Sequence, residues 1–114
     1  MPMIRVVTNQ SLSSQGKNTL QTKLGKAISL IPGKSEQWLM VHLQDEQSLC
    51  FQGDADSPAA FITVKIFGST NPVHYQKLSQ AITDILAEAA HIPTNRCYIQ
   101  YEECSQWAWN GSHF

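Results

Sequence analysis

The chain has few charged residues. Of its 114 residues, 15% are charged, with eight Lys and Arg, nine Asp and Glu, and a formal net charge of −1. Proteins that bind nucleic acids or anionic membranes need clustered Lys and Arg. The charge balance therefore argues against nucleic acid and against a membrane surface as partners.

Cysteine is also scarce. Cys50, Cys97 and Cys104 are odd in number and fit neither a disulfide framework nor a Cys-x-x-Cys motif. The four histidines show no metal-ligand spacing with cysteines or carboxylates. We therefore predict no metal and no cofactor, and a reducing cytoplasm as the setting.

A long apolar run is missing as well. No stretch is long enough to cross a bilayer, and no basic segment followed by an apolar one marks a secretory signal. We expect one domain, residues 1–114, large enough to bury a core and small enough for association between chains. The expected location is cytoplasmic, and release from the cell without a signal peptide is the alternative.

What the chain does contain is one pattern used twice. Residues 3–8, MIRVVT, and 38–43, WLMVHL, are predicted strands that flank a helix whose apolar residues recur every three or four positions. Residues 59–67, AAFITVKIF, and 97–101, CYIQY, flank a second helix of the same kind. The sequence therefore predicts two strand–helix–strand units.

Start signals precede both helices. Ser13 or Ser14 is expected to cap the first helix, and Thr70 or Asn71 the second, where Pro72 falls in the first turn. Two such units predict an α+β fold, a two-layer sandwich in which a four-stranded mixed sheet carries both helices on one face. The sheet face without helices would be exposed to solvent or buried against copies of the chain.

Two apolar segments favour association between chains. In the second strand, Trp38, Leu39, Met40, Val41 and Leu43 are all apolar, and such a strand needs burial on both faces. The tail, CSQWAWNGSHF, is dense in aromatic residues. We expect this tail to pack on a neighbouring subunit or to line a pocket.

The chain opens MPMIRV, with Pro2 directly behind the methionine. A small second residue usually lets an aminopeptidase remove the initiator. The chain would then begin with a secondary amine, which is a base. The alternative is that Pro2 only rigidifies the start of a strand, where its missing N–H costs nothing.

Five motifs follow one another along the chain: the MPMI opening, GK before the strand that ends VHL, CFQGDADSPAAF, IPTNRCYIQY and the closing WNGSHF. In their order and spacing they resemble the macrophage migration inhibitory factor and D-dopachrome tautomerase family of the tautomerase superfamily. The resemblance covers almost the whole chain. It implies a homotrimer whose sheets form a central barrel, with an active site at each subunit interface.

The resemblance also implies an activity. It is a keto–enol tautomerase acting on phenylpyruvate-like α-keto acids, with D- or L-dopachrome as further candidate substrates and Pro2 as the catalytic base. An N-terminal amine has an ordinary pKa of about 7.7–8.0, and an apolar pocket beside a lysine would lower it. A general base works best with a pKa near ambient pH.

Two residues correspond to the carboxylate-binding part of the family site. Lys34 of the GK motif resembles the residue that receives the substrate carboxylate; the alternative is a solvated lysine in a turn. Phe67 falls where the family usually has an isoleucine whose backbone N–H binds the same group. Ile66 replaces the family serine before it, and Gly68 keeps the glycine that follows.

Other residues correspond to the pocket wall. From the neighbouring subunit, Tyr98 and Gln100 would face the pocket, since residues two apart on a strand share a face. Gln100 stands where family members often have asparagine. Trp109 and Phe114 match the aromatic wall, and Trp38 stands where a rim tyrosine is common. Core or interface packing is the alternative for Tyr98 and Trp109.

Three other functions are weighed against the tautomerase. Some family members carry a Cys-x-x-Cys pair where this chain has AAFI, residues 59–62, which argues against a thiol oxidoreductase. A cytokine-like signalling or binding protein with a weak or vestigial pocket is the main alternative. Hydration or dehalogenation of small acids generally needs further pocket arginines or carboxylates, and neither Arg5 nor Arg96 is an obvious second anchor.

Overall fold

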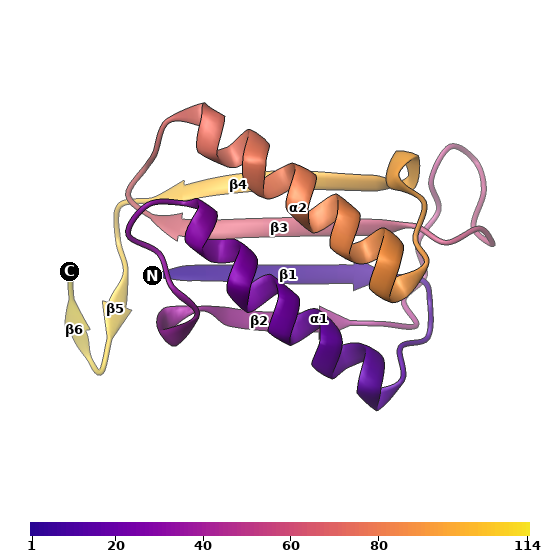
Figure 1. The fold of residues 1–114 in the computed structure, drawn as a ribbon, viewed down its shortest axis with the longest axis horizontal. Coiled ribbons are helices and arrows are strands. Elements are labelled where there is room, and N and C mark those ends of the chain that lie inside the picture. The colour runs from indigo at the N-terminus through magenta and orange to yellow at the C-terminus, as the bar shows by residue number, and fades with distance from the viewer.

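The computed structural model describes residues 1–114 (Figure 1). Its main elements are the strand β1 (Pro2–Thr8), the helix α1 (Ser14–Ala27), the strands β2 (Met40–Gln44) and β3 (Ala60–Phe67), the helix α2 (Pro72–Ala90) and the strand β4 (Cys97–Cys104). Three short 3₁₀ turns, η1 (Ile28–Leu30), η2 (Glu36–Trp38) and η3 (Thr94–Arg96), and two short strands, β5 (Ala108–Trp109) and β6 (Ser112–His113), complete the chain.

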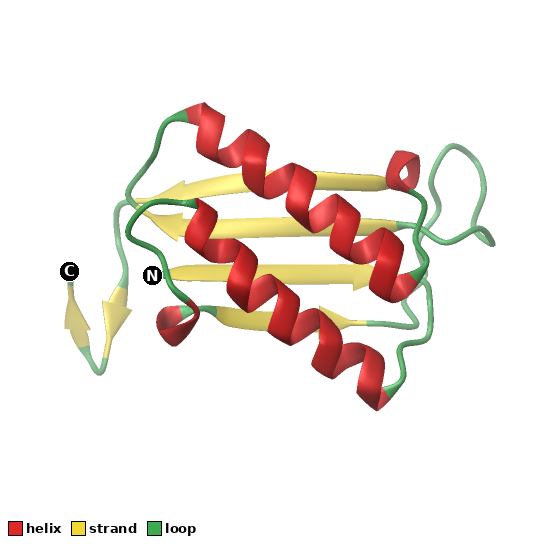
Figure 2. Cartoon of the chain, in the orientation of Figure 1, coloured by secondary structure: helices red, strands yellow, loops and turns green.

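The four long strands form one mixed sheet in the order β2-β1-β3-β4. β1 runs parallel to β2, β3 runs parallel to β4, and the two pairs join through the antiparallel β1 and β3, where Pro2 lies opposite Ile66. Both helices cover the same face of this sheet (Figures 1 and 2). The predicted α+β sandwich of two strand–helix–strand units is confirmed.

The helix starts follow the predicted capping chemistry. The Ser13 side chain accepts a hydrogen bond from the backbone N–H of Gly16, and the Asn71 side chain accepts one from Val73, with Pro72 at the first helical position. These bonds satisfy backbone donors that have no partner within the helix. Of the residues considered for each cap, Ser13 and Asn71 are the ones that serve.

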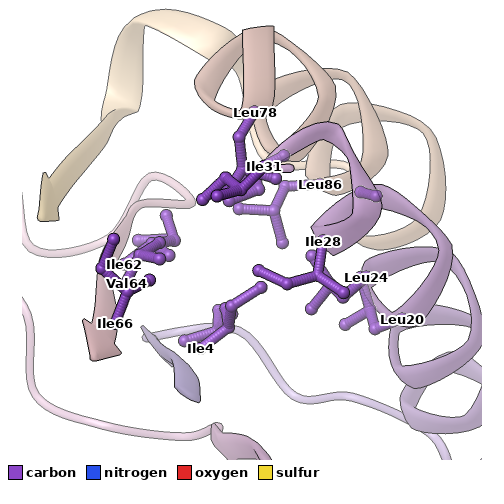
Figure 3. Packing of buried hydrophobic residues seen from close by; sticks show 14 of the residues in the cluster. Ile4, Leu20, Leu24, Ile28, Ile31, Ile62, Val64, Ile66, Leu78 and Leu86 are labelled. Carbon is purple, nitrogen blue, oxygen red and sulfur yellow. The ribbon is translucent and has the colours of Figure 1, made fainter. Parts of the chain in front are cut away.

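The core lies between the helices and the sheet (Figure 3). It contains 15 buried residues, and the helical ones recur at the predicted spacing of three or four. The helices contribute Leu20, Leu24, Ala27, Leu78, Ile82 and Leu86, and the facing strands contribute Ile4, Val6, Ala60, Ile62, Val64 and Ile66. Burying side chains of this size is the main stabilising term of the fold.

The predicted second strand is wrong at its start. Trp38 ends the turn η2, in which the backbone N–H groups of Trp38 and Leu39 donate to Ser35 and Glu36, so this stretch cannot join the sheet ladder. β2 begins at Met40 and lies at an edge of the sheet. Met40 is 66% exposed on this single chain, so the burial expected for this strand is not supplied within one subunit.

The aromatic tail folds into a small antiparallel hairpin, β5–β6. Its turn uses Asn110 and Gly111, both at positive φ, and an Asn-Gly pair strongly favours such tight hairpins. The hairpin lies near the N-terminus, at one end of the sheet (Figure 1).

Neither the length nor the apolar character of any helix suffices for a membrane span.

Candidate active site

A cavity of about 420 Å³ opens at the end of the sheet where β1 begins. Three segments build it: the first residues of β1, the turn η2 with the start of β2, and the stretch that leads into β5. Its lining residues are Met1, Pro2, Met3, Gln37, Trp38, Leu39, Met40, Trp107, Ala108 and Trp109. Eight of the ten are hydrophobic, so the cavity suits an apolar or aromatic group.

Two tryptophans form one wall of this cavity. The rings of Trp38 and Trp109 meet edge to face, with their centroids 5.1 Å apart and their planes at 83°. This is a favoured arrangement for aromatic pairs. Trp38 remains 41% exposed and Trp109 55% exposed, so their free ring surfaces are available to a bound molecule.

The N-terminal residue is tied to the end of β3. The backbone N–H of Phe67 donates a hydrogen bond of 3.0 Å to the Met1 carbonyl. The carbonyl of Phe67 in turn accepts a 3.0 Å hydrogen bond from Nζ of Lys34. Lys34 reaches this point because the chain reverses just before it at Gly33, whose φ of 82° is easy only for glycine. Lys34 and the N-terminus therefore meet at Phe67.

This environment changes the basicity of the terminal amine. Burial, and then the positive charge and hydrogen bond of Lys34, lower the pKa of the Met1 amino group from 8.0 to about 6. Both effects disfavour the protonated, charged amine. The Met1 amine is therefore largely free base at neutral pH.

Phe114 closes the arrangement from the C-terminal side. Its ring lies 5.8 Å from that of Phe67, centroid to centroid, and its backbone N–H donates to the Trp107 carbonyl.

The structure thus brings six of the eight predicted site residues to one end of the sheet. Pro2, Trp38 and Trp109 line the cavity, while Lys34, Phe67 and Phe114 adjoin it through the contacts described above.

The other two predicted residues lie elsewhere on the same chain. Tyr98 pairs with Phe61 and Gln100 with Thr63, whereas Pro2 lies opposite Ile66 further along β3. Tyr98 lines a second, smaller cavity of about 130 Å³ near the start of β3 and β4. Within one chain, Tyr98 and Gln100 do not join the cavity of Pro2.

Sequence reasoning did not assign several of the lining residues to the site. Trp107 belongs to the aromatic tail for which the sequence predicts packing on a neighbouring subunit or a place in a pocket wall, but it is not among the assigned site residues; it lines the cavity directly before β5, which begins at Ala108. Gln37, Leu39 and Met40 line the cavity because η2 turns the chain before β2, and no motif marks that turn. Met3 lines the cavity as the residue that follows Pro2 on β1.

No metal centre accompanies the cavity. The chain contains no group of three or more His, Cys, Asp or Glu side chains that could hold a metal ion. The three cysteines are free thiols. The chemical resources of the site are an amine of lowered pKa, a lysine cation and an aromatic cavity. Together they can bind an aromatic carboxylic acid and accept a proton from it.

The chain thus combines a mixed sheet of two strand–helix–strand units with a cavity lined by its N-terminal residues. A protein-family model described as "Macrophage migration inhibitory factor (MIF)" matches residues 1–114. The chain belongs to the macrophage migration inhibitory factor family.

Named relatives agree with this assignment. The chain is 32% identical over 119 residues to the macrophage migration inhibitory factor homolog of Brugia malayi, covering all of this chain and 99% of that protein. It is 29% identical to the Xenopus tropicalis macrophage migration inhibitory factor over 116 residues, again covering all of this chain and 99% of the relative.

Solved structures extend the agreement to the fold. The crystal structure of Leishmania major MIF2 superposes with a TM-score of 0.93 at 27% identity, covering all of this chain and 97% of the other. The homologue from Prochlorococcus marinus gives a TM-score of 0.87 at 27% identity, with 98% of each chain covered.

Proposed function

We propose that the chain, after loss of Met1, is a keto–enol tautomerase of phenylpyruvate-like α-keto acids and that the Pro2 amine is its base. The observation that carries the proposal is that Lys34 and the N-terminus meet at Phe67, where burial and Lys34 lower the pKa of the Met1 amine to about 6. The same two causes would act on a Pro2 amine once Met1 is removed, and an amine of lowered pKa is free at neutral pH and still takes up protons effectively.

Removal of Met1 would do two things at once. It would turn the Pro2 nitrogen from an amide into a secondary amine. It would also release the Phe67 N–H, which the Met1 carbonyl occupies in the full-length chain. A substrate carboxylate could then accept from that N–H and pair with Lys34, while its aromatic ring rests against Trp38 and Trp109.

The proton steps follow from this placement. Pro2 takes a proton from the carbon next to the keto group, and the C–H electrons form the carbon–carbon double bond of the enol. The carbonyl electron pair moves to oxygen, which then takes the proton held by the Pro2 ammonium, so that Pro2 returns to its free-base form. In the reverse direction, Pro2 takes the proton of the enol hydroxyl, and its ammonium returns that proton to carbon. Lys34 holds the carboxylate throughout.

The direct test is an assay of the processed chain with phenylpyruvate, its hydroxylated analogue and dopachrome methyl ester. The absorbance of the enol form for the two keto acids, and the absorbance of dopachrome methyl ester itself, should change faster than in buffer. We expect phenylpyruvate at least to be converted. A processed, folded chain that accelerates none of the three conversions would refute the tautomerase. That result would favour the alternative of a signalling or binding protein with a vestigial pocket.

We also propose a homotrimer that completes the site. The sheet face away from the helices bears exposed apolar side chains, with Met40 66%, Tyr98 60% and Phe61 37% exposed. Tyr98 and Gln100 lie too far along the sheet to reach their own subunit's Pro2 cavity. Closed association that buries this face would allow them to contribute to a neighbour's site.

The assembly can be measured by light scattering. At micromolar concentration the expected mass is about three times the 12.7 kDa of one chain. A fully active monomer would contradict the proposed trimer, because Tyr98 and Gln100 would then have no site to complete.

A further inference from the structure

The side chain of Arg96 is directed at a single loop. Its Nε donates to the carbonyl of Pro58 at 2.9 Å, Nη1 donates to Phe51 at 3.1 Å, and Nη2 donates to Asp54 at 3.0 Å and Ser57 at 3.2 Å. Four carbonyls from eight consecutive residues therefore converge on one guanidinium. The three ion pairs of the chain involve other residues, so backbone carbonyls, not an ion pair, satisfy Arg96.

The loop held by Arg96 is also closed on itself. The carboxylate of Asp54 accepts hydrogen bonds from the backbone of Asp56 and Ser57 and from the Ser57 hydroxyl. The Ser57 hydroxyl is the largest of the effects that lower the pKa of Asp54 to about 2. Asn9, just beyond β1, donates from its side chain to the Ser57 carbonyl at 2.9 Å. The loop is therefore an ordered unit whose position on the sheet is set by Arg96 and Asn9.

This loop carries an aromatic ring to Tyr98. The Phe51 ring lies between two partners: Cζ of Arg96 is 5.4 Å from its centroid, and the Tyr98 ring is 4.9 Å away at 65°. Tyr98 itself is 60% exposed on an edge strand of the sheet. An exposed tyrosine samples several rotamers, and an edge-to-face contact with a fixed ring restricts that choice.

We infer that Arg96 is a positioning residue for the substrate pocket: through the loop and Phe51, it holds Tyr98 in the orientation in which Tyr98 contacts substrate in a neighbouring subunit. The inference rests on the proposed function, because it takes Tyr98 as a pocket residue of the trimer. Arg96 itself does not line the cavity that contains Pro2.

Lysine cannot replace arginine in this role. The guanidinium offers five N–H groups in a rigid fork, whereas an ammonium is a compact point charge with three rotatable donors. An Arg96→Lys variant keeps the positive charge but cannot hold four separated carbonyls. Phe51 and Tyr98 should then lose their fixed contact while β4 and the core remain intact.

The first test is kinetic and uses the processed full chain. Arg96→Lys should raise KM for phenylpyruvate by at least about threefold in the wild-type background and have little further effect in a Tyr98→Ala background. Turnover and the acid limb of the pH–rate profile should stay unchanged, since Pro2 and Lys34 are untouched. Phe51→Leu should repeat the KM effect while leaving the Arg96 hydrogen bonds in place.

The matched control is Lys26→Arg, a charge-preserving change at an exposed residue in the last turn of α1, away from the sheet face that is proposed to associate. Its KM should equal that of the wild type. An equal KM effect of Arg96→Lys with and without Tyr98, or no effect at all, would overturn the inference. If Arg96→Lys does not fold, the Phe51→Leu and Tyr98→Ala pair decides by the same comparison.

The second test does not depend on activity. Nuclear Overhauser contacts between the ring protons of Phe51 and Tyr98 should be present in the wild type and lost in Arg96→Lys. Retention of these contacts in a folded variant would overturn the inference. If the wild type shows the contacts but no tautomerase turnover, the proposed function fails and the orientation of Tyr98 by Arg96 is still decided by this measurement.

Discussion

A Pro2→Gly variant that has lost Met1 is expected to fall in turnover, up to the roughly 10²–10⁴-fold that one positioned base contributes. The variant keeps an N-terminal amine but loses the ring, the secondary amine and the fixed geometry. Steady-state kinetics with phenylpyruvate would measure the loss.

Folding should be unaffected by this change. Pro2 is buried at the start of β1, where it makes one strand pair, but it does not belong to the core cluster, which begins at Ile4. Thermal unfolding and light scattering of Pro2→Gly should therefore match the wild type. Unchanged turnover in the variant would return Pro2 to the simpler role of a rigid strand start.

Lys34→Ala is expected to raise KM most, because Lys34 would hold a carboxylate that is present in the ground state and in the transition state alike. A hydrogen bond to a charged group contributes about 1.5–3 kcal/mol, which corresponds to a loss of about 10- to 150-fold in kcat/KM. Lys26→Ala is the matched control, since Lys26 is an exposed lysine in the last turn of α1.

The direction in which the acid limb of the pH–rate profile moves in Lys34→Ala tests whether Lys34 lies near the base. Burial and Lys34 together lower the pKa of the Met1 amine to about 6, and we expect the same causes to act on the Pro2 amine once Met1 is removed. Removing the lysine charge removes a cause that lowers this pKa, so the pKa of Pro2 rises and the acid limb of the rate profile moves to higher pH. Lys34→Arg keeps the charge and should leave that limb close to its wild-type position. An acid limb that stays in place or moves down in Lys34→Ala would mean that Lys34 is not near the base.

The architecture could be predicted from the sequence because it depends on local periodicity. Leu20 and Leu24 in α1, and Leu78, Ile82 and Leu86 in α2, repeat at helical spacing and are fully buried. The β-branched strands between these helices allow few sheet topologies, because the crossover connections are right-handed. The start of β2 could not be predicted in this way, because an apolar run does not reveal the 3₁₀ turn that contains Trp38.

The site depended on contacts between distant residues. Lys34 and Phe67 are 33 positions apart, and their hydrogen bond forms only because α1, its following turn and β3 end at the same side of the sheet. Residue patterns alone favoured a solvated Lys34, and only the family resemblance placed it in a site. The sequence marks Trp107 as part of an aromatic tail, but Trp107 lines the cavity only because of where the hairpin folds back.

Whether the freed Pro2 amine is the base can be decided by comparing two forms of the same chain. One preparation is uniformly processed and the other uniformly retains Met1, as verified by intact mass. We predict turnover of phenylpyruvate by the processed form only, since the retained form has an amide at Pro2 and its Met1 carbonyl occupies the Phe67 N–H. Equal turnover by the two forms would contradict the claim, because the retained form has no basic nitrogen at Pro2 and only the Met1 amine at its N-terminus.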